Sequence, residues 1–238
     1  PLIVSADAAT KEYDGTTAAT FSNITYTPAS GVFDAAKVGG TLAGTGKNVG
    51  SHDLTGLYTT SQQGYLIDYD PAATLTITPR ALTASVTAAN KVYNGTTEAT
   101  ITGGITLGNL VVGDTVSATY TSGDFADQHV GNNKAVTLAG LGLTGADAGN
   151  YSLAADSVTS SASITPKTLT ITAVTDTKPY DGTTSSGGGP AVSGLVVGVG
   201  DTIDGLSQAF ANKNVLGAGN STLTVTGYTI NDGNNGQN

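Results

Sequence analysis

The side chains best suited to chemistry occur in one seven-residue phrase that is repeated along the chain. It reads KEYDGTT at 11–17, KVYNGTT at 91–97 and KPYDGTT at 178–184. A catalytic signature is normally needed once per active site, whereas this phrase occurs three times. The second copy also has asparagine in place of aspartate, an exchange that a catalytic carboxylate would not tolerate. We therefore interpret the phrase as structural, with these key residues: Lys11, Tyr13, Asp14, Gly15, Lys91, Tyr93, Asn94, Gly95, Lys178, Tyr180, Asp181 and Gly182.

The centre of the phrase is a turn signal. Asp-Gly and Asn-Gly favour the type I′ turn of a β-hairpin, because that turn needs positive φ at two successive positions. The sequence therefore predicts a hairpin at each copy. The tyrosine ring would pack over the adjoining strand, and the Thr-Thr pair would begin the next strand.

Other catalytic arrangements are weakly supported. The two histidines differ in position, since His52 follows a Val-Gly pair and His129 precedes one, and neither has a nucleophile beside it. The acidic residues are dispersed and do not match between repeats, whereas glycoside cleavage needs a defined carboxylate pair. We expect the protein not to be an enzyme.

Calcium is the one ion that the sequence suggests, because oxygen-rich loops between β-domains can bind it. The candidate ligands are Asp68 and Asp70, spaced two apart near the end of the first repeat, and Asp232 in an Asn-rich segment. None of them fits a known calcium-loop pattern. Solvated loops are the simpler interpretation, so we expect no cofactor and keep calcium as a candidate.

Composition excludes several classes of function. The 238 residues contain 9 Lys and Arg against 18 Asp and Glu, a net charge of −9, so no basic surface for nucleic acid is expected. No apolar run approaches the roughly 18 residues that span a bilayer, so no membrane insertion is expected. The first residues lack the pattern of a signal peptide. The absence of Cys excludes disulfides and thiolate metal sites.

The repeated phrase defines the domain organisation. Its tyrosines stand at 13, 93 and 180, so the spacings are 80 and 87 residues. Such spacings suit small tandem domains better than solenoid repeats. An Ile-Thr-Pro sequence followed by a basic residue precedes the second and third copies, with its proline at Pro79 and Pro166. The predicted domains are therefore 1–79, 80–166 and 167–238.

The segments between turn signals alternate Thr with Val, Ile, Leu or Ala, which is the pattern of half-buried strands. We predict an all-β fold of small immunoglobulin-like β-sandwiches in a rod, with β-grasp-like domains as the alternative. A short helical turn is expected near 33–37.

The third copy stops before the Gly-Asn-Tyr and final strand that the second copy has at 149–165. A sandwich without a terminal strand has an open edge, which is a liability or a docking site. Completion of this repeat by another chain is therefore one hypothesis.

The K-x-Y-[D/N]-G-T-T phrases, the Ile-Thr-Pro junctions and Gly149-Asn150-Tyr151 resemble the YDG-type repeat of filamentous-haemagglutinin-like bacterial adhesins, which are exported by two-partner secretion. The first repeat departs from this pattern, with Gln63-Gly64-Tyr65 in place of Gly-Asn-Tyr. The resemblance covers the whole chain and implies extracellular modules on the bacterial cell surface without catalytic residues.

We therefore expect structural stalk repeats of a large adhesin that support cell adhesion or biofilm formation. The expected partners are neighbouring repeats of the same polypeptide or like chains, with surface glycans or a host receptor bound through a distal region. Two alternatives stay open: a filament subunit completed by strand donation, and a glycan-binding module. The second is poorly equipped, since the chain has no Trp and ten Tyr.

Overall fold

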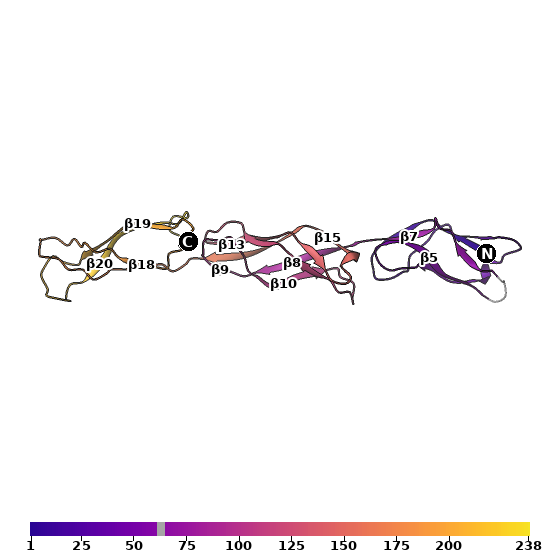
Figure 1. Ribbon diagram of the computed structural model, residues 1–238, viewed down its shortest axis with the longest axis horizontal. Helices are drawn as coiled ribbons and strands as arrows, with labels where there is room; N and C mark the ends of the chain where they lie inside the picture. The colour runs from indigo at the N-terminus through magenta and orange to yellow at the C-terminus, as the bar shows by residue number, and fades with distance from the viewer. Residues whose placement is uncertain (61–64) are drawn as a thin grey trace. The chain divides into compact units, whose positions relative to one another are not determined.

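The computed structural model describes residues 1–60 and 65–238. The chain divides into two compact units, whose boundary passes through the second repeat. Figure 1 labels the secondary-structure elements. Unit 1 comprises residues 1–85, 105–121 and 140–158, and unit 2 comprises residues 86–104, 122–139 and 159–238. Gln63 and Gly64 lie outside the described residues.

The first repeat, within unit 1, contains two mixed sheets. The strand order is β2-β7-β5-β4 in the larger sheet and β3-β1-β6 in the smaller one. β2 runs parallel to β7, and β1 runs parallel to β6, whereas the other pairs are antiparallel. The strands are β1 (Leu2–Ser5), β2 (Ala9–Glu12), β3 (Thr25–Pro28), β4 (Val38–Gly44), β5 (Gly50–Thr59), β6 (Ile67–Tyr69) and β7 (Thr74–Thr78).

Alternation of side chains builds the core of unit 1. In β7, Leu75 and Ile77 are buried, whereas the alternating threonines at 74, 76 and 78 are partly or fully exposed, as the period of a half-buried strand requires. The other buried apolar side chains of this cluster are Val4, Tyr13, Leu42, Leu54, Ala73, Leu82 and Tyr151. The cluster thus includes residues of both the first and the second repeat.

The second repeat contributes to both units. Its small sheets have the orders β10-β8-β15 and β11-β14. In its larger sheet, β12-β13-β16-β9, β16 lies between β13 and the parallel strand β9. The elements are β8 (Arg80–Ala88), β9 (Lys91–Val92), β10 (Ile101–Gly108), β11 (Ser117–Thr119), β12 (Ser122–Phe125), β13 (Gly131–Ala139), β14 (Gly142–Thr144), the 3₁₀ helix η2 (Ala148–Asn150), β15 (Tyr151–Leu153) and β16 (Ser157–Thr165).

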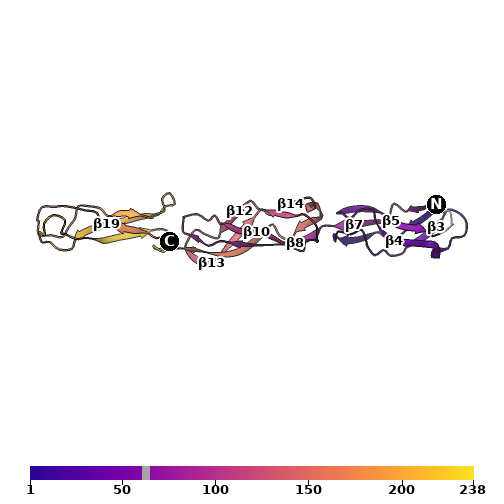
Figure 2. The same cartoon turned by 90° about the horizontal axis from the view of Figure 1, so that it is seen from below.

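The third repeat, within unit 2, is simpler. It has two two-stranded sheets, made of β17 (Thr170–Thr172) with β18 (Ala191–Ser193) and of β19 (Thr202–Phe210) with β20 (Leu223–Asn231). β19 and β20 lie side by side in Figures 1 and 2. Among the described residues of unit 2, every buried Ala, Val, Leu, Ile, Phe or Tyr side chain belongs to the second repeat. The third repeat instead buries the amide of Gln208, which is hydrogen-bonded to both backbone groups of Val174.

The structure confirms the predicted all-β class and the short helical turn, which is the 3₁₀ helix η1 (Ala35–Lys37). The parallel pairs depart from the antiparallel order of an immunoglobulin domain. Each parallel pair joins a strand near the start of a repeat to a strand near its end. No helix in the described part of the chain is long and apolar enough to cross a membrane.

Candidate functional site: two tyrosine joints

The repeated phrase forms a turn, but not the predicted hairpin. The Asp14 Oδ1 atom accepts hydrogen bonds from the N–H and hydroxyl of Thr16, at 2.9 and 2.8 Å, and only the glycine has positive φ, 77° at Gly15. β2 ends at the phrase and pairs with β7, not with the residues that follow the turn. The type I′ hairpin was therefore a wrong prediction. The side chain closes the turn, and because asparagine offers the same Oδ1 atom, Asn94 closes its turn in the same way, at 3.2 and 3.0 Å.

The lysine of each phrase folds back over this turn. Lys11 Nζ donates to the carbonyl oxygens of Thr16 and Ala18, and Lys91 Nζ donates to those of Thr96 and Glu98. Lys178 makes the corresponding bond to Thr183. Burial lowers the pKa of Lys91, against the opposing influence of nearby carboxylates. The lysines thus hold the local turn conformation.

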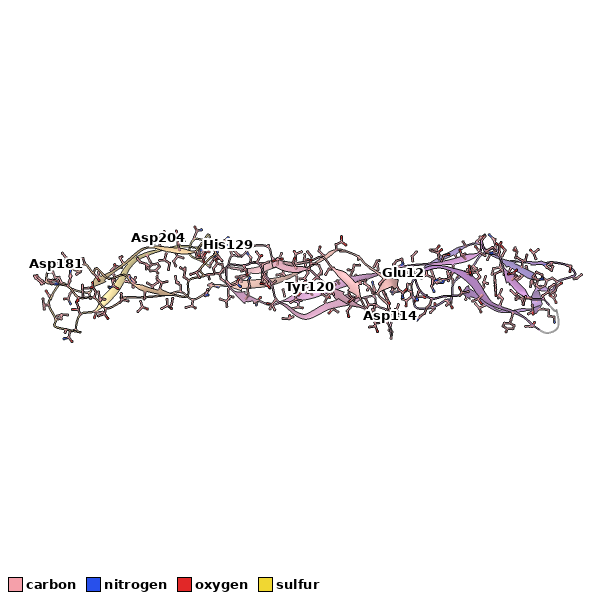
Figure 3. All side chains as sticks on the ribbon, viewed as in Figure 1. Glu12, Asp114, Tyr120, His129, Asp181 and Asp204 are labelled. Carbon is pink, nitrogen blue, oxygen red and sulfur yellow. The ribbon has the colours of Figure 1, made fainter. Side chains whose placement is uncertain are left out.

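The tyrosine of the first phrase reaches into the next repeat. Tyr13 is 0% exposed, and its hydroxyl donates to Asp114 Oδ2 at 2.9 Å. Tyr151 donates to the same oxygen at 2.6 Å, and the two rings meet edge to face with centroids 5.3 Å apart. We call this arrangement of Tyr13, Asp114 and Tyr151 the first joint; it lies within unit 1. Glu12 and Asp114 are labelled beside it in Figure 3.

Burial and the carboxylate both keep Tyr13 neutral. Loss of solvation raises the pKa of Tyr13 to about 12, and the hydrogen bond to Asp114 acts in the same direction. The pKa of Tyr151 is also raised, first by burial and then by its bond to Asp114. The joint is therefore a pair of phenol donors on one carboxylate acceptor, stable at neutral pH.

Several contacts surround the first joint. Arg80 Nε donates to the carbonyl of Asn109 at 2.7 Å, and its guanidinium lies 3.6 Å from the Glu12 carboxylate. The Asn150 side chain accepts a bond from the Val49 N–H at 2.9 Å. A Cβ atom on Gly15 would lie 3.1 Å from Val111. The turn glycine thus also permits close approach between repeats.

The second joint, formed by Tyr93, Asp201 and Asn238, lies within unit 2 and has one tyrosine–aspartate hydrogen bond where the first joint has two. Tyr93 is 2% exposed, and its hydroxyl donates to Asp201 Oδ1 at 3.1 Å. The Asn238 side chain accepts from the Val130 N–H at 3.0 Å, as Asn150 does from Val49. A Cβ atom on Gly95 would approach Val199 to 2.5 Å, so this contact is tighter than the one at Gly15.

The third copy of the phrase has the same turn without a joint. Gly182 has φ 74°, and Asp181 Oδ1 accepts from the Thr183 N–H at 2.9 Å. Tyr180, however, is 65% exposed. Figure 3 shows Asp181 of this turn far from His129 within unit 2.

The calcium candidates are not brought together. Asp68 is exposed on β6, while Asp70 lies just beyond β6 and accepts bonds from Ser5 and the Ala72 N–H. Burial of Asp232 would raise its pKa, but bonds from backbone N–H groups of the loop 234–238 outweigh this and lower it. Within the described ranges, no group of three His, Cys, Asp or Glu side chains could hold a metal ion.

The histidines have local partners. His52 Nε2 lies 2.6 Å from the carbonyl oxygen of Asn48, and His129 Nδ1 lies 3.1 Å from Asn238 Nδ2. His129 therefore belongs to the second joint.

Sequence reasoning missed the acceptors of both joints. Asp114 and Asp201 each stand in a Val-Gly-Asp-Thr segment, and the two segments are 87 residues apart, which is also the spacing of Tyr93 and Tyr180. That shared spacing was the available signal. It could not show that each aspartate contacts the tyrosine of the preceding repeat.

The fold and the joints define a class of tandem all-β repeats in which the repeated phrase is an inter-repeat contact. A family model described as the YDG domain matches residues 1–72, 78–160 and 165–238, so the chain belongs to the YDG domain family. No curated protein and no solved structure matches the chain.

Proposed function

We propose that this chain is a spacer, a series of YDG domains forming part of the stalk of a large extracellular bacterial adhesin that supports cell adhesion or biofilm formation. The observation that carries the proposal is that the tyrosine of the repeated phrase contacts the following repeat in the first two copies. The side chains of Tyr13 and Tyr93 form contacts between successive repeats, so they are buried and cannot bind a ligand.

The chemistry of the joints suits such a role. Each joint buries an aromatic ring whose hydroxyl is hydrogen-bonded to a half-buried carboxylate, so bending at a joint would expose apolar surface and separate the hydroxyl from its acceptor. At the first joint, Arg80 also donates a hydrogen bond to a backbone carbonyl, and the Asn150 side chain accepts one from a backbone N–H. A spacer needs resistance to bending between its domains, and these contacts would supply it.

Small-angle scattering tests the proposal on the full chain. A single globule of this length has a radius of gyration of about 18 Å, whereas a spacer would give a much larger, concentration-independent value. Replacing both acceptors, Asp114→Ala with Asp201→Ala, should loosen the joints and broaden the distance distribution. The exposed Asp68→Ala is the matched control. A globular value for the unaltered chain would contradict the spacer.

Two further measurements test the glycan-binding alternative and the extracellular location. A glycan panel should give no binding; binding abolished by substituting an exposed tyrosine such as Tyr58 or Tyr228 would favour the glycan-binding module instead. Antibodies raised against the chain should label intact bacterial cells that produce the parent protein. Labelling only after cell lysis would contradict the extracellular location.

A further inference from the structure

The chain contains two Asn-Gly dipeptides, Asn94-Gly95 in the second copy of the phrase and Asn235-Gly236 in the third repeat. An asparagine before a glycine can modify itself, because the unhindered glycine nitrogen can attack the side-chain amide carbon and expel ammonia. In a folded chain this reaction requires that the attacking nitrogen and the amide be free of other bonds. The structure distinguishes the two dipeptides on this point.

The side chain of Asn94 is exposed, and the turn prepares its amide for attack. Asn94 Oδ1 accepts hydrogen bonds from the N–H and the hydroxyl of Thr96, at 3.2 and 3.0 Å. These two donors would stabilise the negative charge that develops on Oδ1 when a nucleophile adds to the Cγ atom. The Gly95 nitrogen lies within the ring that the bond from the Thr96 N–H closes, so the turn holds the nucleophile close to the amide carbon.

The two nitrogens that the reaction needs are also free at this site. Within the described residues, neither the Gly95 N–H nor the Asn94 Nδ2 atom takes part in a hydrogen bond. At the other dipeptide, the Gly236 N–H donates to Asp232 Oδ1 at 2.8 Å. Attack by the Gly236 nitrogen would therefore first break a hydrogen bond to a carboxylate, which is one of the stronger kinds. The fold thus favours reaction at the dipeptide of the second copy.

The first and third copies of the phrase show how an aspartate fits this turn. Lys11 Nζ lies 2.6 Å from Asp14 Oδ1, and Lys178 Nζ lies 2.9 Å from Asp181 Oδ1. Lys91 has the same contacts with backbone carbonyls, but in the part of the chain that the structure describes it makes no ion pair. An aspartate at position 94 would supply the missing partner.

An aspartate in this turn also resists further reaction. The same ring closure at an aspartate needs the protonated carboxyl group, because an ionised carboxylate is a poor target for a nucleophile. The hydrogen bond from Lys178 lowers the pKa of Asp181 to about 2, so this carboxylate is ionised at neutral pH. Conversion of the asparagine would therefore proceed in one direction.

We propose that Asn94 is a self-modification site, at which the chain converts its own asparagine to aspartate and isoaspartate with water as the only reagent. The Gly95 nitrogen loses its proton to the solvent and bonds to Asn94 Cγ, while the bond between Cγ and Nδ2 breaks and ammonia leaves. Water then opens the cyclic imide. Cleavage between Cγ and the Gly95 nitrogen gives aspartate, and cleavage between the backbone carbonyl carbon and that nitrogen gives isoaspartate.

The two products have different consequences for the second joint. Aspartate keeps the backbone of the turn and gains the ion pair with Lys91. Isoaspartate lengthens the main chain by one carbon beside Gly95, which is buried and where an added Cβ would lie 2.5 Å from Val199. Because this contact has no spare room, isoaspartate should displace Val199 and loosen the second joint. The modification itself follows from the turn and does not depend on the spacer role.

The test incubates the full chain at mildly alkaline pH and follows each asparagine by peptide mapping. Mass spectrometry detects conversion as a gain of about 1 Da, the change from a side-chain amide to an acid. Asn94 should convert at least about tenfold faster than Asn235, which corresponds to about 1.4 kcal/mol of activation free energy. In guanidinium chloride neither dipeptide keeps its folded contacts, so the two rates should become similar.

Variants of the turn test the assigned roles. Thr96→Val removes the hydroxyl donor to Asn94 Oδ1 and should slow conversion about tenfold in the folded chain. Thr96→Ser keeps a hydroxyl and is the matched control, with a rate close to that of the unaltered chain. In guanidinium chloride Thr96→Val and Thr96→Ser should react alike, because the hydroxyl is then no longer held against the amide.

The products can be separated by ion exchange. The aspartate fraction should elute and melt like the variant Asn94→Asp, whereas the fraction that is labelled by isoaspartyl methylation should melt at a lower temperature. An isoaspartate fraction with an unchanged melting temperature would overturn the predicted effect on the second joint.

The proposal is overturned if Asn94 does not convert in the folded chain, or if Asn235 converts as fast. A rate ratio that stays the same in guanidinium chloride would also overturn it, because the fold would then not select the site. All of these measurements concern the incubated chain. Scattering of the freshly purified chain tests the spacer separately.

Discussion

The second and third repeats contain the same phrase in two different environments. Tyr93 and Tyr180 follow a lysine at the same spacing and precede turns of nearly identical φ, 75° at Gly95 and 74° at Gly182. Yet Tyr93 is 2% exposed and Tyr180 is 65% exposed. The turn is therefore determined by its own residues, whereas the burial of the tyrosine is determined by the repeat that follows.

The cores of these repeats also differ. Val136 and Leu138 of β13 are fully buried beside β16, whereas Leu223 and Val225 of β20 are half-buried. The third repeat is held together more by polar contacts, such as those of Gln208 and those of Asp176 with Ser186 and the N–H groups of Gly187 and Gly188. The packing of the repeats thus depends on residues far apart in the sequence, which the following perturbations test.

The largest effect is expected from Asp114→Ala. This change leaves the hydroxyls of Tyr13 and Tyr151 buried without their acceptor, and each unpaired group costs roughly 1–3 kcal/mol. Chemical denaturation followed by circular dichroism should show a loss of about 2–4 kcal/mol in the transition that includes the first joint. Asp114→Asn keeps an acceptor oxygen and should lose less. Equal losses would mean that the hydrogen bonds do not matter.

The second largest effect is the loss of stability that we expect at alkaline pH, where the buried tyrosines ionise. Tyr13 has a folded-state pKa of about 12, against about 10 in an unfolded chain. The raised value favours the neutral phenol, so its stabilising contribution is complete below pH 10 and is lost as pH rises toward 12. The loss is about 2.7 kcal/mol for two pKa units. Phenolate formation can be followed by ultraviolet absorbance as the pH is raised. The component that titrates at the highest pH should be missing in Tyr13→Phe, and an unchanged titration curve would contradict its assignment to Tyr13.

Substitutions at two matched glycines distinguish the contribution of the turn to stability from that of the joint. Gly95→Ala and Gly182→Ala place a side chain at almost the same positive φ, which costs roughly 1–3 kcal/mol. At Gly95 the new Cβ would also meet Val199 at 2.5 Å, whereas at Gly182 nothing lies within 4 Å. Calorimetry should therefore show the larger loss for Gly95→Ala. A loss of the same size at both sites would show that the repeats do not approach closely at the second joint.

These comparisons also explain what the sequence could predict. The strand class followed from local alternation, as in β7 and β16, and the turn followed from Asp-Gly and Asn-Gly. The turn type did not, because the Asp14 side chain replaces a second residue of positive φ. The joints could not be predicted, because Tyr13 and Asp114 are separated by 101 residues and no local pattern specifies which distant carboxylate accepts a hydrogen bond from a given tyrosine.

The smallest effect comes from a single hydroxyl. Tyr13→Phe keeps the ring in the first joint and leaves Asp114 with the bond from Tyr151, so the expected loss is about 1 kcal/mol. Tyr180→Phe alters a largely exposed side chain and should change stability by less than about 0.5 kcal/mol. Both variants can be compared by urea denaturation of the full chain. If Tyr180→Phe were as costly as Tyr13→Phe, the tyrosine would act within its own turn, and the phrase would stabilise each repeat without joining it to the next.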